Sequence, residues 1–372
     1  MQRREVVTAF LRRDDKLLLL RRSAAVGSYR GRWSAVSGYL EDPTPQAQAR
    51  RETLEETGIG PDALTLAAIG DPLPVPAPEM DVLWIVHPFL FDLTPQVPVT
   101  LDWENVEAAW VAPAEIAALS CVPALDRAYE NCINPRASTA AFAAGCEEIA
   151  SDRAHGAAEL ARRAMGLLEQ LAAAGDGPDD PASATARFTN LARLLPRTRP
   201  SMVPIDTLVS QWVSDAEALD SGAVTDPAQV LAAKAAALRD RSRLATQAAA
   251  ANLADHLQHG CCVITLSYSS TVKAALIAAV VKDIHVIVAE SRPLNEGAVL
   301  ARELAAAGLR VSLITDAQIA HHIANADLAL IGADSVTPEG AVINKVGSHL
   351  LALAAQAARL PVYAVYESMK RQ

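Results

Sequence analysis

The chain has 372 residues, of which 51% are apolar but only 4% aromatic, and its formal net charge is −10. One hydrophobic core does not usually cover this length, so the sequence predicts two or three domains. The acidic balance argues against the basic surface that nucleic acids and anionic membranes require, and we expect neither as a partner.

The cysteines and the N-terminal residues indicate the cellular compartment of the protein. The five cysteines are scattered and show no metal-ligand spacing, which is typical of a reducing compartment. The first residues lack the apolar core of a secretory signal, and no apolar run approaches the roughly 20 residues of a membrane helix. We therefore expect a cytoplasmic protein.

The first part of the chain has a mixed pattern. Residues 5 to 22 predict two strands around the polar turn Asp14-Asp15-Lys16, and further strand-like runs occur at 82 to 86 and 89 to 91. One helix is predicted between these two groups of strands. From about residue 135 to 258 the sequence is rich in alanine and predicts helices, with breaks near 175 to 181 and 196 to 204.

After residue 259 short apolar runs alternate with helical stretches. Continuous apolar strands separated by helices are what a parallel sheet covered on both faces requires. The sequence therefore predicts an α/β protein with three parts: a mixed domain at 1–130, a helical subdomain at 131–258 and a Rossmann-like parallel-sheet domain at 259–372.

The predicted helix of the first part has well-marked ends. Thr44 can cap the first turn, Pro45 suits the first helical position, and Gly58 can adopt the left-handed conformation after the last turn. The boundaries of this helix can thus be read from local chemistry alone.

Three carboxylates lie on one face of this helix, at positions i, i+3 and i+4. Glu52, Glu55 and Glu56 repel one another by roughly 0.2–0.5 kcal/mol per pair in an exposed helix. A divalent cation would turn that repulsion into coordination, and oxygen ligands favour Mg²⁺ or Mn²⁺. The alternative is a solvated acidic face balanced by Arg50 and Arg51.

The residues around the acidic cluster resemble a known family. Arg-Glu-Thr-Leu-Glu-Glu-Thr-Gly-Ile at 51–59 is similar to the second half of the Nudix box, and the segments at 31–38 and 101–111 are similar to regions that flank it. The resemblance covers about residues 1–125 and implies an α/β/α sandwich that hydrolyses a nucleoside diphosphate derivative.

By this resemblance Glu52, Glu55 and Glu56 are metal ligands, the Gly38 carbonyl is a further ligand, and Arg51 is the arginine of the box. The glutamate that braces this arginine in the family is replaced by a proline in this chain, so a pseudo-enzyme remains an alternative. We expect one of the two acidic residues just upstream to reach Arg51 instead. The replaced position is Pro43, and the upstream acids are Glu41 and Asp42.

Glu104 and Glu107 are candidates for another metal ligand or a general base. The alternative is an exposed structural role for both.

The rest of the chain resembles another superfamily, which includes the alpha, beta and delta subunits of initiation factor 2B, ribose-1,5-bisphosphate isomerase and methylthioribose-1-phosphate isomerase. The resemblance covers about residues 140–370 and rests on the segments 152–157, 198–203, 290–297 and, most specifically, 331–348. It implies a pocket for a sugar phosphate or a nucleotide, and a homodimer. Phosphate-binding candidates are Arg199, Arg292 and Lys345, and residues expected to contact the sugar are Ser267, Asp334 and Asn344.

Ser267 occupies the place where the isomerases of this superfamily have a cysteine. A serine hydroxyl lacks the accessible pKa of a thiol and is a poor proton shuttle without an added base. Cys262 is five residues away along a strand, about 16 Å, and cannot take this role. We therefore expect a silent binding site in this domain. The alternatives for the whole chain are a regulatory, metabolite-binding protein in which neither domain is catalytic, and a sugar-phosphate isomerase with an accessory Nudix domain.

Overall fold

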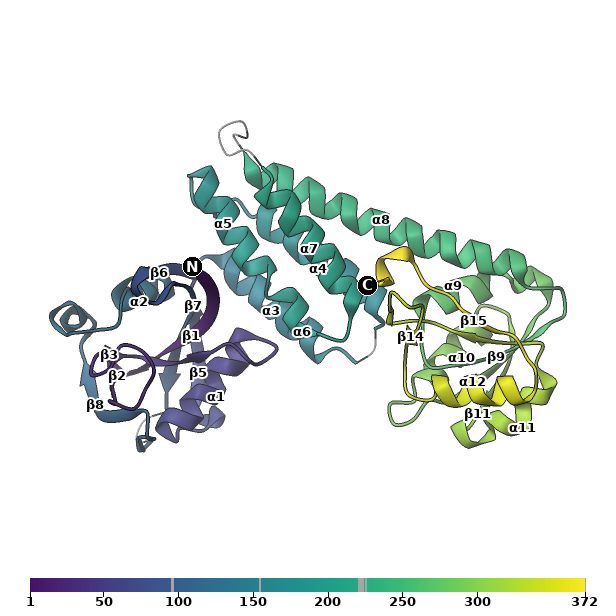
Figure 1. Ribbon diagram of the computed structural model, residues 1–372, viewed down its shortest axis with the longest axis horizontal. Helices are drawn as coiled ribbons and strands as arrows, with labels where there is room; N and C mark the ends of the chain where they lie inside the picture. Colours follow the sequence, from purple (N-terminus) through teal and green to yellow (C-terminus); the bar gives the residue numbers. More distant parts are fainter. Residues whose placement is uncertain (95–96, 154, 220–223, 225, 372) are drawn as a thin grey trace. The chain divides into compact units, whose positions relative to one another are not determined.

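The computed structural model describes residues 1–94, 97–153, 155–219, 224 and 226–371. These residues belong to two compact units (Figure 1). The first unit comprises Met1–Ala150, Leu167–Thr198 and Asp215–Ala232, and the second comprises Ser151–Gly166, Arg199–Ser214 and Ala233–Gln372. The helical residues between 131 and 258 are therefore divided between the two units.

The first unit is built around a mixed sheet. Among the described residues its main path runs β3-β2-β1-β7-β5, while β4 pairs with β1, β6 with β7 and β8 with β2. The polar turn predicted at Asp14-Asp15 joins the first two strands. The strands are β1 (Gln2–Arg13), β2 (Lys16–Arg22), β3 (Trp33–Ser34), β4 (Val36–Tyr39), β5 (Leu64–Ile69), β6 (Leu73–Ala77), β7 (Val82–Leu93) and β8 (Asn105–Val111).

Helices α1 (Pro45–Thr57) and α2 (Leu125–Ile133) cover opposite faces of this sheet. Leu90 of β7 shares a core cluster with Leu125 of α2. Its neighbour Phe91 must point to the other face, since successive strand side chains alternate, and there it lies under Arg50 of α1 at 5.1 Å. The predicted α/β/α arrangement is confirmed.

Strand β7 continues through Pro88, although the sequence predicted two separate strand segments. Residues Val82 to Val86 pair with β6, whereas Phe89 to Leu93 pair with β5. Pro88 falls where one partner strand ends and the next begins, so its missing N–H interrupts neither antiparallel ladder.

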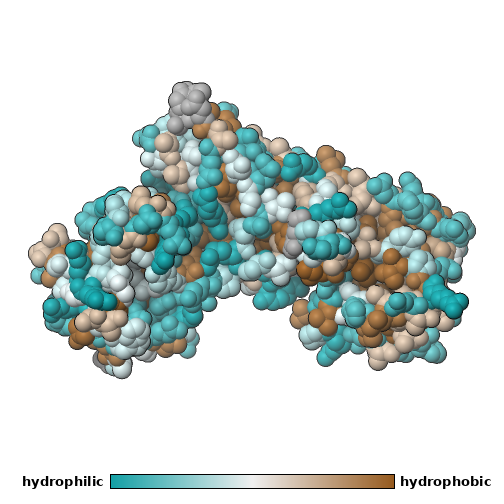
Figure 2. Space-filling view, viewed as in Figure 1, coloured by the Kyte–Doolittle hydropathy of each residue, from teal (hydrophilic) through white to brown (hydrophobic). Residues whose placement is uncertain are grey.

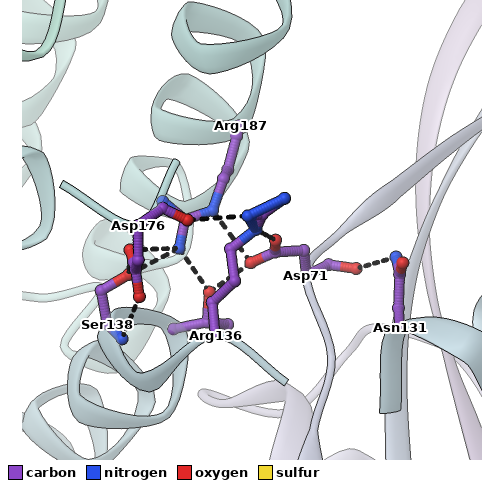
Figure 3. A network of polar contacts seen from close by, with 7 residues as sticks. Asp71, Asn131, Arg136, Ser138, Asp176 and Arg187 are labelled. Carbon is purple, nitrogen blue, oxygen red and sulfur yellow. Dashed lines mark hydrogen bonds and ion pairs between the residues drawn. The ribbon is translucent and has the colours of Figure 1, made fainter. Parts of the chain in front are cut away.

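The helical segment consists of α3 (Ala137–Ser151), α4 (Ala157–Ala173), α5 (Pro181–Ala192), α6 (Leu195–Thr198), α7 (Val203–Glu217) and α8 (Pro227–His256). Within the first unit, α3 and α5 are fastened to the loop after β5 by a polar network around Asp71 (Figure 3). Arg187 of α5 is buried, donates to Asp71 at 2.9 Å and to Ser138 at 2.7 Å. Arg136 also donates to Asp71, and Ser138 to Asp176.

The second unit contains a parallel sheet of order β11-β10-β9-β12-β15. One face is covered by α9 and α10 and the other by α11 and α12, as separate core clusters show. The elements are β9 (Cys262–Leu266), α9 (Ser270–Ala278), β10 (His285–Ala289), α10 (Glu296–Ala306), β11 (Arg310–Ile314), α11 (Ile319–His322), β12 (Leu328–Ile331), β13 (Ser335–Val336), β14 (Val342–Ile343), α12 (Ser348–Ala357) and β15 (Val362–Ala364).

This sheet confirms the predicted Rossmann-like class. The four strands predicted between residues 262 and 331 correspond to β9 through β12, whereas β15 was not predicted. Among the described helices of both units, none is long and apolar enough to cross a bilayer.

Candidate functional site

Helix α1 begins and ends as its sequence predicts. The Thr44 side chain accepts a hydrogen bond from the Ala47 amide, Pro45 opens the helix, and Gly58 has a φ of 69°. These caps fix the register of α1 and place its three glutamates in the last two turns.

A cavity of about 670 Å³ lies beside this end of α1. Glu52 and Glu55 line it from the helix, and Glu104 lines it from the loop before β8. Gly38 of β4 and Arg51 also border the cavity. Glu52, Glu55 and Glu104 thus open onto one space large enough for a small metabolite.

Gly38 is needed for this arrangement. A Cβ atom added at Gly38 would lie 2.0 Å from the carboxyl carbon of Glu52, so no larger residue fits without moving that carboxylate. The Glu52 side chain is therefore held against the backbone of β4. The Gly38 carbonyl, predicted as a further ligand, belongs to a residue in contact with the central carboxylate.

Glu56 is separated from the other two glutamates by burial, being only 4% exposed. Its oxygens accept hydrogen bonds from the Ser37 amide at 2.9 Å and from Asn105 Nδ2 at 2.7 Å. Burial raises the pKa of Glu56 to about 8, opposed by these two hydrogen bonds and reinforced by Glu52 and Glu104. At neutral pH the carboxyl is largely protonated in the metal-free chain.

Glu104 and Glu107, the two candidates from the far side, have different surroundings. Glu104 lines the cavity, and burial, Asp102 and Glu55 raise its pKa against the opposing charge of Arg22. Glu107 is exposed on β8 and forms an ion pair with Arg21 at 3.3 Å. The geometry favours Glu104 and gives Glu107 the exposed structural role.

The bracing of Arg51 agrees with the expectation for the two upstream acids. Arg51 Nη2 lies 3.1 Å from Glu41 Oε2, and Arg51 Nε lies 3.0 Å from Asp42 Oδ2. Both acids reach the arginine from the bend just before α1. The side chain lost at Pro43 is thus replaced by its two predecessors.

Gln48 connects this brace to the carboxylates, and the sequence analysis did not identify it. Its Oε1 accepts from the amides of Glu41 and Asp42 at 2.9 and 2.8 Å and from Arg51 at 2.9 Å. Its Nε2 donates to Glu52 Oε1 at 2.6 Å. Gln48 is 1% exposed, and its position one helical turn before Glu52 was the available signal.

The donor set fits Mg²⁺ or Mn²⁺ in chemistry. Burial raises the pKa of Glu52, and Glu55 and Glu104 raise it further, so the carboxylates around the cavity repel one another. Across the part of the chain that the structure describes, no three histidine, cysteine or acidic side chains already enclose a single point. An open oxygen site of this kind suits a cation that keeps several waters and also binds substrate phosphate.

The second unit gathers a second set of charged residues, around Asp334. Burial raises the pKa of Asp334, and Lys370, Lys345 and Arg199 oppose this shift through their charges. Arg199 and Lys345, both predicted, therefore lie near the predicted aspartate. Lys370 was not predicted, because nothing in the C-terminal sequence shows that the chain returns to the loop that carries Asp334.

The two lysines near Asp334 already have acidic partners. Lys345 Nζ lies 2.6 Å from Glu296, and Lys370 Nζ lies 3.7 Å from Glu367. Each glutamate also has one buried oxygen with no hydrogen-bond partner among the described residues. The cations are thus partly neutralised within the protein.

The remaining predicted residues of this region lie at strand ends and loops. Ser267 is buried directly after β9, has a φ of 62°, and its amide donates to Ser291. Asn344 donates to Ser348. Arg292 is exposed and interacts with Asn295 at 3.4 Å, and its charge is not among those that shift Asp334.

Comparison with known proteins agrees with both resemblances. Residues 153–372 match the model of the Initiation factor 2 subunit family, and residues 1–132 match the NUDIX domain model. A ribose 1,5-bisphosphate isomerase of Haloferax volcanii is 29% identical over 230 residues, 60% of this chain and 68% of that protein.

A curated protein and a solved structure from Pyrococcus horikoshii are also similar to this chain. A translation initiation factor eIF-2B subunit 2-like protein is 38% identical over 149 residues, which are 40% of this chain and 54% of that protein. This chain thus spans about half the length of that relative. The crystal structure of translation initiation factor eIF-2B from this organism has a TM-score of 0.56 and 29% identity, over 64% of this chain and 81% of that one.

Proposed function

Because the chain belongs to the Initiation factor 2 subunit family and carries a NUDIX domain ahead of that region, we propose a two-part metabolic protein. The NUDIX domain hydrolyses the diphosphate linkage of a nucleoside diphosphate derivative with Mg²⁺ or Mn²⁺. The observation that carries this proposal is the cavity shared by Glu52, Glu55 and Glu104, with Arg51 braced beside it.

The residues of this chain divide the work by position. Glu52, Glu55, Glu56 and the Gly38 carbonyl would hold the cation, which would supply Lewis-acid polarisation of a phosphate oxygen and of an attacking water. Glu104 faces the same cavity and has a raised pKa, so it is suited to accept a proton from that water. Gln48 and Arg51 keep the Glu52 carboxylate in place.

A screen tests this activity directly. The purified full chain is incubated with a panel of nucleoside diphosphate derivatives and either Mg²⁺ or Mn²⁺, and release of phosphate-containing products is measured. Turnover of at least one compound is expected. A panel that stays intact with both metals would refute the proposed hydrolysis.

The two carboxylates near β8 provide a matched pair of variants. Glu104→Gln should lower hydrolysis about tenfold or more, because the only loss is a proton acceptor in the cavity. Glu107→Gln should leave hydrolysis within twofold, because Glu107 is exposed and pairs with Arg21 outside the cavity lining. Initial rates over a pH series check both, and equal effects of the two changes would contradict the assignment.

The second unit is proposed to bind a phosphorylated metabolite, a sugar phosphate or a nucleotide, without converting it. Support comes from the cations around Asp334 and from the isomerase among the relatives. Ser267 stands at the position of the isomerase cysteine, and a serine hydroxyl is a poor proton shuttle without an added base. Isomerisation is therefore the weaker candidate.

Arg292→Ala should weaken binding of this ligand by about tenfold to a hundredfold. A phosphate held by arginine gains charge-assisted hydrogen bonds of roughly 1.5–3 kcal/mol each. Arg292 is exposed, and its hydrogen bond to Asn295 is long, at 3.4 Å. The guanidinium is therefore available to a ligand. Calorimetry with ribose phosphates, hexose phosphates and nucleoside monophosphates measures the loss, and Ser267→Ala serves as the control with a smaller effect. An unchanged Kd would remove Arg292 from the pocket.

We also propose a cytoplasmic homodimer formed through the second unit. Exposed apolar side chains lie on α12 and on the edge strand β15, and Figure 2 shows apolar surface over α12. The residues are Leu350, Leu353, Val362 and Tyr363, which are 40% to 54% exposed. Closed two-fold pairing is the commonest assembly for soluble chains.

Light scattering at micromolar concentration should give the mass of a dimer. The double change Leu350→Glu and Leu353→Glu should produce monomers, because two buried charges would oppose the interface. Val281→Glu is the control, since Val281 is 82% exposed and lies after α9 rather than on α12. A monomeric wild-type chain would contradict the proposal.

A further inference from the structure

Residues 40–44, which we call the brace segment, join β4 to α1 and carry the two acids that pair with Arg51. The Leu40 amide donates to a carbonyl of β1 at 3.0 Å, and the next two amides donate to Gln48. Gln48 in turn donates to Glu52. A shift of the brace segment would therefore move the groups that support both Arg51 and Glu52.

One end of the brace segment is held by a side chain of α6. The Nη2 atom of Arg197 donates a hydrogen bond to the Leu40 carbonyl. Leu40 is only 7% exposed, and backbone carbonyls in buried positions require a donor. Helix α6 also gives Arg197 a fixed base, because its neighbours Leu195 and Thr198 are buried.

The other end of the brace segment is held by a side chain of α3. The Thr44 hydroxyl donates to Glu147 Oε1, while its oxygen accepts from the Ala47 amide. A hydroxyl can make both bonds at once, since it has one proton and two lone pairs. The Glu147 carboxylate therefore orients the oxygen that caps α1.

Packing keeps these helices against the start of α1. A small cavity of about 30 Å³ lies between them, lined by Thr44 and Pro45 on one side and by Phe142, Cys146 and Leu194 on the other. All five residues are buried. The sheet, α3 and α6 belong to the same compact unit, so both contacts with the brace segment are made within that unit.

The two side chains that hold the brace segment come from outside the NUDIX match. That match ends at residue 132, whereas Glu147 follows it and Arg197 lies within the match to the Initiation factor 2 subunit family. Neither side chain lines the cavity that Glu52 and Glu55 share. Any influence on the chemistry there must pass through the brace segment.

We propose that Arg197 and Glu147 are positioning residues of the hydrolytic site. They hold the brace segment at both ends, so that its acids meet Arg51 and its amides meet Gln48. The site is then complete only with α3 and α6 packed against it. The effect on the rate rests on the proposed hydrolysis, whereas the placement of the segment can be measured without it.

Hydrogen exchange of the full chain without metal, followed by mass spectrometry, tests this placement. In Arg197→Ala the two amides that donate to Gln48 should exchange at least tenfold faster than in the wild type. Peptides from β2 and β7 should keep their rates, which a general loss of stability would not allow. Arg193→Ala is the matched control, because Arg193 lies at the end of α5 and pairs with the exposed Glu217.

The hydrolysis assay supplies a second measurement. Arg197→Ala should lower kcat about tenfold, which is typical when groups that orient metal ligands are removed. KM should change less than twofold, because Arg197 does not line the cavity. Arg197→Lys keeps a charged donor and should stay within threefold of the wild type in both measurements. Glu147→Ala repeats the test if Arg197→Ala does not fold.

The outcomes separate the two proposals. Faster exchange of the brace segment in a chain that hydrolyses no diphosphate would support the placement and refute the proposed reaction. Wild-type exchange in both Arg197→Ala and Glu147→Ala would overturn the positioning role, whatever the rate of hydrolysis. Faster exchange with an unchanged kcat would also overturn it, because the segment would then move without affecting the reaction.

Discussion

Glu52→Gln should lower hydrolysis of the preferred nucleoside diphosphate derivative by about a hundredfold to ten-thousandfold. The change keeps size and helix propensity but removes the charge from the carboxylate at the centre of the acidic cavity. Glu52 is in contact with Gly38, accepts from Gln48 and faces Glu55 and Glu104. Single-turnover and steady-state rates with Mg²⁺ and with Mn²⁺ measure the loss.

The fold should survive this substitution, since it removes a repulsion rather than a packed group. Thermal unfolding of the metal-free variant is expected to occur at or above the wild-type temperature. Glu107→Gln again serves as the control for a carboxylate outside the cavity. A Glu52→Gln enzyme with more than half of the wild-type rate would show that the reaction occurs elsewhere.

Arg187→Ala should destabilise the first unit by about 3–5 kcal/mol. Removing one partner of a buried ion pair leaves the other charge uncompensated. The Arg187 side chain is 4% exposed, and it pairs with Asp71 at 2.9 Å while donating to Ser138 and Thr139 (Figure 3). Without the Arg187 guanidinium, α5 loses its ion pair with Asp71 in the loop after β5.

Urea unfolding and calorimetry should each show this loss of stability in one of the unfolding transitions of the chain, because the two units need not unfold together. Arg193→Ala is the control at the end of the same helix. Its partner Glu217 is more than half exposed, and such surface pairs contribute about 0–1 kcal/mol. Equal destabilisation by the two changes would deny the network a special role.

Local chemistry explains why much of the first unit could be predicted. The caps at Thr44 and Gly58 determine the ends of α1, and the spacing of its glutamates places them together without tertiary information. Glu56 shows the limit of this reasoning. Helical spacing places Glu56 beside Glu52 and Glu55. In the folded chain its carboxyl is buried and accepts hydrogen bonds from Ser37 and Asn105, which are distant in sequence.

Residues whose role depends on tertiary contacts escaped prediction. Gln48 resembles any polar residue of a helix until the loop at Glu41 folds over it. Lys370 is near Asp334 only because the C-terminal segment returns across the second unit, where Arg371 pairs with Val336. Arg292 was identified from its sequence context, which could not show that its charge is not among those that shift the pKa of Asp334.

The buried position of Glu56 bears on the proposed uptake of a cation. Burial raises the pKa of its carboxyl to about 8, so a cation that took this carboxylate as a ligand, as proposed, would have to displace a proton near neutral pH. Proton and cation would then compete for the same oxygens, and the apparent metal affinity of the proposed site would fall as the solution is acidified.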